Sequence, residues 1–142
     1  MTRAVHSDES GQTTVLILGV VAVVLMLTAA IISATSVNLA ARQLLAEADA
    51  AASAAVYAAQ TGGTVPRASS AEVLEAAEEH LLRSGAHQRH TELQVSRAWT
   101  SDSGQTVHVE LTATAELPVL RWVLPAQVEV TADSHARVTV HR

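Results

Sequence analysis

Several residue types that common forms of protein chemistry require are absent from this 142-residue sequence. There is no cysteine, which excludes disulfide bonds, a thiolate zinc site and a cysteine nucleophile. All nine basic residues are arginine, so the lysine of Schiff-base and P-loop chemistry is missing. Phenylalanine is also absent, and one tyrosine and two tryptophans supply few large core side chains. A soluble core built from this sequence must therefore be thin.

Charge and length narrow the function classes further. The formal net charge is -5, and no cluster of basic residues provides a surface for nucleic acid. The length allows one small domain and argues against a multidomain enzyme. We therefore expect no nucleic-acid partner.

One long apolar run is the most informative feature of the chain. No charged residue occurs between Glu9 and Arg42, and the stretch from Val15 to Ala34 is apolar except for Thr28 and Ser33. About 20 apolar residues cross the ~30 Å hydrocarbon layer of a bilayer, whereas the apolar part of a signal peptide has roughly 7 to 15. The run predicts a single membrane span.

The lengths on either side of the span indicate its orientation. Residues 1–11 form a leader too short to fold, whereas most of the chain follows the span. We expect the N-terminus inside the cell and the C-terminal part outside. The alternative is a cleaved signal peptide, because Ala34-Thr35-Ser36 provides the small residues that signal peptidase requires.

The predicted helix continues beyond the membrane, from about Thr13 to about Gln60, because neither glycine nor proline interrupts residues 20–61. We assign residues 12–60 to a transmembrane and extended alanine-rich helix. Apart from a narrow polar stripe, its outer part is small and apolar, and such residues at four-residue spacing allow helices to approach closely. We predict helix packing against other subunits through this face; the alternative is a stalk without partners. The packing residues are Leu44, Ala48, Ala51, Ala52, Ala55 and Ala59.

A second region begins after a linker at residues 61–68, which contains Gly62-Gly63 and Pro66. Ser69 and Glu72 have the spacing of a capping box, and apolar residues then recur with helical period up to Gly85. Residues 69–142 are therefore assigned to a small domain that begins with an amphipathic helix.

The rest of the domain has the period of β-strands. Leu93, Val95 and Trp99 alternate with polar residues before a turn at 101–104, and two further alternating stretches cover 107–115 and 128–140. We predict an α+β fold in which one helix covers the apolar face of three or four antiparallel strands, resembling a minimal pilin head.

A proline-bracketed apolar segment separates the last two strands. Pro118 and Pro125 enclose the apolar residues Leu120, Trp122 and Leu124. Such a segment either folds over the sheet or serves as a docking loop against the membrane interface or a partner.

Residues suited to chemistry are present but not arranged for it. His80, His87 and His90 could be metal ligands, yet two of them fall in a predicted loop. Ser103, His108 and Asp102 lie at a hairpin tip without a nucleophile elbow. We predict no catalytic, metal or cofactor-binding residue and no enzymatic activity.

Two segments together resemble a known family. They are Glu9-Ser10-Gly11-Gln12-Thr13-Thr14 with the apolar run that follows, and Ala40-Ala41-Arg42-Gln43-Leu44-Leu45-Ala46-Glu47-Ala48-Asp49-Ala50-Ala51 with the alanines that follow. They resemble the TadE/TadG-like proteins of the tight-adherence (Flp) pilus system. The resemblance implies a pseudopilin-like protein of the bacterial cytoplasmic membrane, with the lipid bilayer and other pilus or secretion-system subunits as partners.

The same resemblance implies a processing site and a subunit class. A prepilin-type peptidase would cut between Gly11 and Gln12. The fifth residue after that cut is Leu16, where pilins carry a glutamate, so a minor pilin or assembly component is expected rather than the major subunit. The alternative function is a signal-anchored extracytoplasmic binding or sensing protein unrelated to pili.

Overall fold

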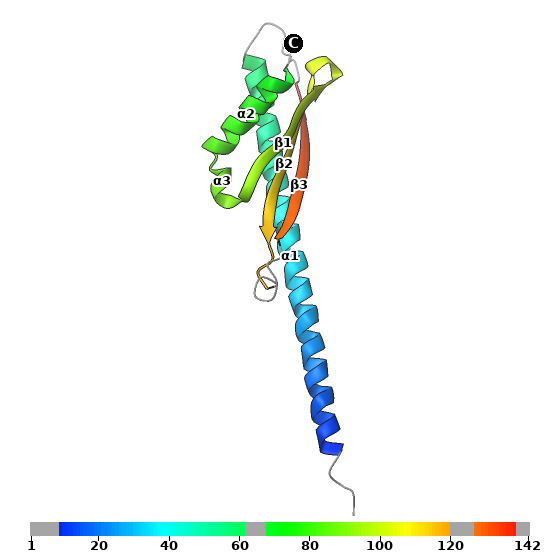
Figure 1. Cartoon of the computed structure of the whole chain (residues 1–142). Coiled ribbons are helices and arrows are strands. Elements are labelled where there is room, and N and C mark those ends of the chain that lie inside the picture. The colour runs from blue at the N-terminus through cyan, green and yellow to red at the C-terminus, as the bar shows by residue number, and fades with distance from the viewer. Residues whose placement is uncertain (1–8, 62–67, 120–126, 139–142) are drawn as a thin grey trace, which may run out of the picture.

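The computed structural model describes residues 9–61, 68–119 and 127–138. Its elements are α1 (Glu9–Thr61), α2 (Ser70–Arg83), α3 (Ala86–Arg89), β1 (Thr91–Ser101), the short 3₁₀ turn η1 (Asp102–Gly104), β2 (Thr106–Glu116) and β3 (Gln127–Arg137). The fold is α+β, as predicted. The first part of α1 extends alone, and the second part runs beside the sheet and α2 to form one head (Figure 1).

The helix α1 is continuous over 53 residues, a little longer than the sequence predicts. Alanine and straight apolar side chains favour this length, and no proline interrupts it. It is long and apolar enough to span a membrane. The predicted leader, residues 1–11, lies mostly outside the described residues, although the helix already begins at Glu9.

The capping box predicted before α2 is confirmed. The Ser69 hydroxyl accepts a hydrogen bond from the Glu72 amide at 3.3 Å, and the Glu72 carboxylate accepts one from the Ser69 amide at 2.8 Å. These bonds satisfy two backbone groups at the start of the helix. The helix ends just before Gly85, which adopts φ 69° and introduces the short helix α3, an element that the sequence did not predict.

The hydrogen bonds of the capping box predict that the stability of the protein depends on pH. The Ser69 amide, and then the Ser69 hydroxyl, lower the pKa of Glu72 below its usual 4.5. This depressed pKa contributes stability that is present above about pH 4.5 and is lost as the pH falls through the lower folded value. We expect Glu72→Gln to lower the melting temperature slightly at pH 7 and to differ less from the unsubstituted protein at pH 3. A difference that grows toward low pH would contradict this.

The sheet has three strands in the order β1-β2-β3, both pairs antiparallel. The alternation predicted for β2 is confirmed, because Val107, Val109 and Leu111 are fully buried. In β3 it is confirmed at Val130 and Ala132, which are buried, whereas Val128 is exposed and residues 139–140 lie outside the described residues. The prediction of one covering helix is wrong. Both α1 and α2 cover the inner face, with α1 against β2 and β3 and α2 against β1 (Figure 1).

Trp99 lies on the outer face of the sheet, although its spacing from Leu93 and Val95 predicts that the three side chains share one face. Register shifts occur along β1, and between Val95 and Arg97 an additional residue is accommodated opposite β2. The bulge reverses the alternation, so that Ala98 faces inward opposite Val109, and Trp99 pairs with His108 on the outer face. The composition could not reveal this change of face.

Candidate functional site

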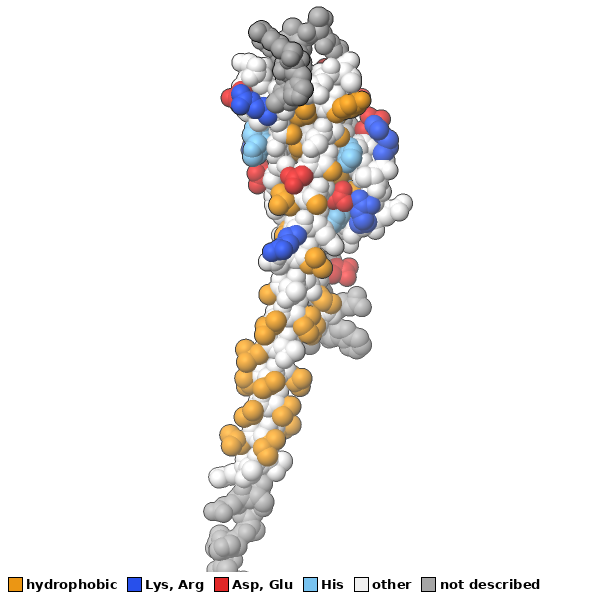
Figure 2. Space-filling view, turned by 180° about the vertical axis from the view of Figure 1, so that it is seen from behind, with side chains coloured by type: hydrophobic (Ala, Val, Ile, Leu, Met, Phe, Trp, Pro, Cys, Tyr) orange, Lys and Arg blue, Asp and Glu red, His pale blue; other side chains and the backbone are white. Residues whose placement is uncertain are grey.

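The candidate membrane anchor is the first part of α1, which extends away from the head and is called the lone part of α1 below. All described side chains from Gln12 to Thr28 are exposed, and none of the most apolar 18-residue window is buried within the chain. Figure 2 shows apolar side chains around this part of the helix, and the charged side chains that it colours lie in the head. A core helix of a soluble protein would bury such residues, whereas here they are exposed along the whole helix surface.

The few polar side chains along the anchor are already hydrogen-bonded. The hydroxyl groups of Thr28, Ser33, Thr35 and Ser36 each donate to the carbonyl oxygen four residues earlier, at 2.8, 2.8, 2.9 and 3.0 Å. A hydroxyl bonded in this way adds no unsatisfied donor to a lipid environment. The two residue types that interrupt the apolar run are therefore compatible with a membrane span.

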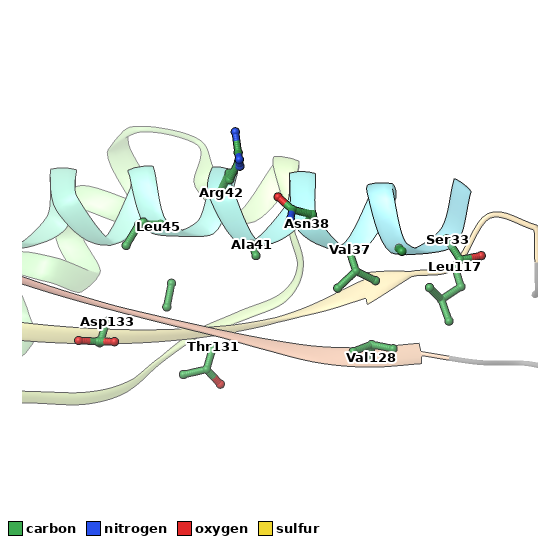
Figure 3. A pocket seen from close by; sticks show the side chains of 12 residues that line it. Ser33, Val37, Asn38, Ala41, Arg42, Leu45, Leu117, Val128, Thr131 and Asp133 are labelled. Atoms are coloured by element: carbon green, nitrogen blue, oxygen red, sulfur yellow. The ribbon is translucent and has the colours of Figure 1, made fainter. Parts of the chain in front are cut away.

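The charged residues enclose an uncharged stretch that is longer than the lone part of α1. Residues 10–41 carry no charge, and at 1.5 Å per residue they extend roughly 48 Å. A bilayer with its headgroup regions is about 40–45 Å thick. Arg42 is exposed and lies where the head begins, on the side of α1 that points away from β3 (Figure 3). It therefore ends the uncharged stretch beside the head, not at the end of the lone part of α1.

The predicted helix-packing residues come together in the head. Leu44, Ala48, Ala51, Ala52 and Ala55 are at most 2% exposed, and Ala59 is half-buried against the same cluster. Their neighbours are the inner face of the sheet and α2 of the same chain. The prediction that other subunits cover this face is therefore wrong. The small side chains bring α1 close to its own sheet instead.

Two polar contacts fix α1 within the head. Asp49 accepts a hydrogen bond from the hydroxyl of Ser134, which ties α1 to β3. Glu47 accepts hydrogen bonds from Nε and Nη2 of Arg89 at 3.2 and 2.7 Å, which ties α1 to α3. The Arg89 Nη1 also donates to the Ser84 carbonyl oxygen at 2.8 Å. Spacing within α1 could not identify these partners, because they are distant in sequence.

An open groove of about 770 Å³ lies between α1 and β3, at the end of the head nearest the anchor (Figure 3). Most of its lining is apolar, with Asn38, Arg42, Thr131 and Asp133 as the polar exceptions. The full lining is Ser33, Ala34, Val37, Asn38, Ala41, Arg42, Leu45, Leu117, Val128, Thr131, Ala132 and Asp133. The groove could not be predicted from the sequence, because its two walls are brought together only by the tertiary fold.

The outer face of the sheet carries a row of stacked side chains. The Trp99 and His108 rings are 4.8 Å apart and nearly parallel, and His135 continues the row with its ring 5.7 Å from that of His108. Arg97 lies over the other face of Trp99, at 5.4 Å. Ser101 Oγ and His108 Nε2 are hydrogen-bonded at 2.9 Å. The row rigidifies the three strands across their exposed face.

The residues considered for chemistry are not brought together as a catalytic or metal site. His108 is bonded to Ser101, and Asp102 accepts a hydrogen bond from Thr106 at 2.9 Å. Across residues 9–61, 68–119 and 127–138, no group of three or more histidine or acidic side chains could hold a metal ion. His80, His87 and His90 thus form no such site among the described residues.

Two predicted sites concern regions for which little or no structure is described. Leu120, Trp122 and Leu124, the predicted docking loop, lie outside the described residues. Gly11 and Gln12, the predicted processing site, lie in the first turn of α1. Both remain predictions.

Comparison of the chain with known protein families, with curated proteins and with solved structures gives no match.

Proposed function

We propose that this protein is a non-enzymatic, TadE/TadG-like minor pilin or assembly component of a tight-adherence pilus or secretion system. It is anchored in the bacterial cytoplasmic membrane by α1, with its N-terminus inside and its head outside. The observation that carries this proposal is the single uninterrupted helix. One part of it exposes an apolar surface, and the other forms the core of a small antiparallel sheet domain. A pilin-like subunit requires both parts.

The residues that carry the family resemblance support the proposal through their positions. Asp49 binds Ser134 of β3, and the alanines around it are buried beneath the sheet. The Arg42-to-Asp49 segment therefore connects the anchor to the head. On this reading, the alanine-rich part of the motif is required for folding, and contacts with other subunits are made by the exposed side of α1, both in the anchor and beside the head.

Crosslinking from a single introduced cysteine tests this proposal. The chain has no cysteine of its own, so the reagent couples to this chain only at the introduced position. A single cysteine would replace Leu25 in the anchor or Ala46 on the exposed side of α1. We expect a benzophenone maleimide, coupled to the single cysteine and then irradiated in membranes of the source cell so that it inserts into C–H bonds of neighbouring proteins, to join the Leu25→Cys or Ala46→Cys variant to other pilus or secretion-system subunits. Mass spectrometry would identify the products.

The comparison position is a cysteine at His87, which is exposed on α3 and not on α1. Crosslinks at Leu25 and Ala46 but not at His87 would support assembly through α1. If membranes that contain the assembled system give no crosslinks at either α1 position, the pilus proposal fails. The alternative, a signal-anchored binding or sensing protein, would then be favoured by the groove beside β3.

A further inference from the structure

The groove between α1 and β3 opens onto the edge of the sheet. Thr131, Ala132 and Asp133 are consecutive, and side chains alternate between the two faces of a strand, so the three cannot line one face together. What the three residues have in common is their position along the edge of the sheet. Figure 3 shows Val37 and Ala41 pointing from α1 toward the strand, while the Thr131 side chain points away from the helix. The groove is thus a slot beside the backbone of β3.

The two edges of the sheet differ in how they are protected. The β1 edge has two register irregularities, and Glu92 within it adopts φ 54°. Bulges of this kind disrupt pairing with a further strand. In contrast, β3 pairs with β2 without interruption from Gln127 to Arg137, and within the described residues no strand pairs with its other side. Among the described residues, the backbone groups on that side of β3 therefore have no partner strand.

We propose that this slot binds an extended peptide segment of a protein partner, which adds a fourth strand to the sheet beside β3. Main-chain hydrogen bonds to the strand edge would supply affinity, and alternate side chains would supply specificity. On the side facing α1, the bound strand meets Val37, Ala41 and Leu45, so small or branched apolar side chains fit there. Asp133 favours a basic residue at the adjacent end of the peptide.

The size of the slot suits such an occupant. Its volume of about 770 Å³ falls within the roughly 300–1,000 Å³ typical of binding sites. A second copy of this chain fits less well. If β3 paired with β3 in antiparallel orientation, the two α1 helices would point in opposite directions and could not enter one membrane in the same sense. This last step rests on the proposed anchoring, whereas the slot itself does not.

Peptide binding to the full chain in detergent micelles tests the proposal independently of any pilus. The probe is a fluorescein-labelled octapeptide of alternating valine and threonine with arginine at one end. The control peptide has the same sequence with alternate amides N-methylated, which removes the hydrogen bonds of one strand edge. We expect the unmethylated peptide to bind and the methylated peptide to bind at least about tenfold more weakly, as measured by fluorescence anisotropy.

Substitutions place the binding in the slot. Ala41→Phe fills the slot from α1, and Ala46→Phe makes the same change on the exposed side of the helix. We expect the first to weaken peptide binding about tenfold and the second to leave it unchanged. Asp133 is exposed, so Asp133→Arg should fold even if Ala41→Phe does not. It should reverse the preference between peptides ending in arginine and in glutamate.

Four results would overturn the proposal. The first is equal binding of the methylated peptide, and the second is binding that neither Ala41→Phe nor Asp133→Arg changes. The third is no binding of the probe together with slow amide hydrogen exchange along β3, which would show that the chain covers this edge itself. Absence of binding with fast exchange would equally count against a strand-binding slot.

Discussion

Replacing Leu44 by alanine is expected to destabilise the head by about 2–5 kcal/mol, the usual cost of removing a fully buried leucine side chain. Leu44 is 1% exposed, and it is one of the largest side chains buried beneath the sheet. A core built largely from alanine and valine has few bulky side chains with which to refill the space. Thermal unfolding in detergent, followed by circular dichroism, should show a melting temperature lower by at least roughly 8 °C.

The next residue along the helix provides the matched control. Leu45 is 43% exposed at the rim of the groove, so Leu45→Ala should cost about 1 kcal/mol or less. The two variants remove the same atoms from adjacent positions and differ only in burial. Equal losses of stability would mean that this part of α1 does not pack against the sheet in the way described.

Placing two aspartates in the anchor is expected to prevent stable membrane insertion. The leucine, isoleucine and valine side chains of the apolar run together favour insertion by roughly 4–7 kcal/mol, and two central aspartates would oppose it by about 5–7 kcal/mol. Val21→Asp with Leu25→Asp should therefore move most of the protein from the membrane to the soluble fraction, as measured by carbonate extraction. Both positions are exposed, so the head should still fold.

Two aspartates elsewhere on the same helix provide the control. Ala46→Asp with Ser53→Asp adds the same charge to exposed positions in the head and should leave membrane insertion unchanged. N-terminal sequencing of the membrane-bound protein should give a start at or before Gln12. A chain that begins after residue 34 and remains soluble would show that the apolar run is a removed signal, and the anchor proposal would fail.

Local patterns predicted the elements well, because each depends on neighbours in sequence. The uninterrupted α1, the Ser69–Glu72 capping box and the alternation along β2 are all confirmed by the structure. These features arise from helix propensity, capping hydrogen bonds and the two-residue period of strands. None of them requires knowledge of which elements lie side by side.

The predictions that were wrong concern contacts between elements. The small apolar face of α1 was correctly expected to pack, but its neighbour is the chain's own sheet, which helical spacing cannot identify. Trp99 changed face because of a bulge, and a single inserted residue is invisible in the composition of a strand. The slot beside β3 was missed for the same reason, since it depends on the placement of α1 along an open edge.

Because α1 runs without a break from the anchor into the head, the anchor and the head move together as one rigid body. Without glycine or proline between Val20 and Thr61, the helix has no hinge at which the head could turn independently. Membrane helices tilt by about 20° on average, and the helix end lies roughly 28 Å beyond Arg42. A tilt of that size carries the top of the head sideways by roughly 10 Å. The direction in which the exposed edge of β3 faces would therefore change with the tilt of α1 in the bilayer.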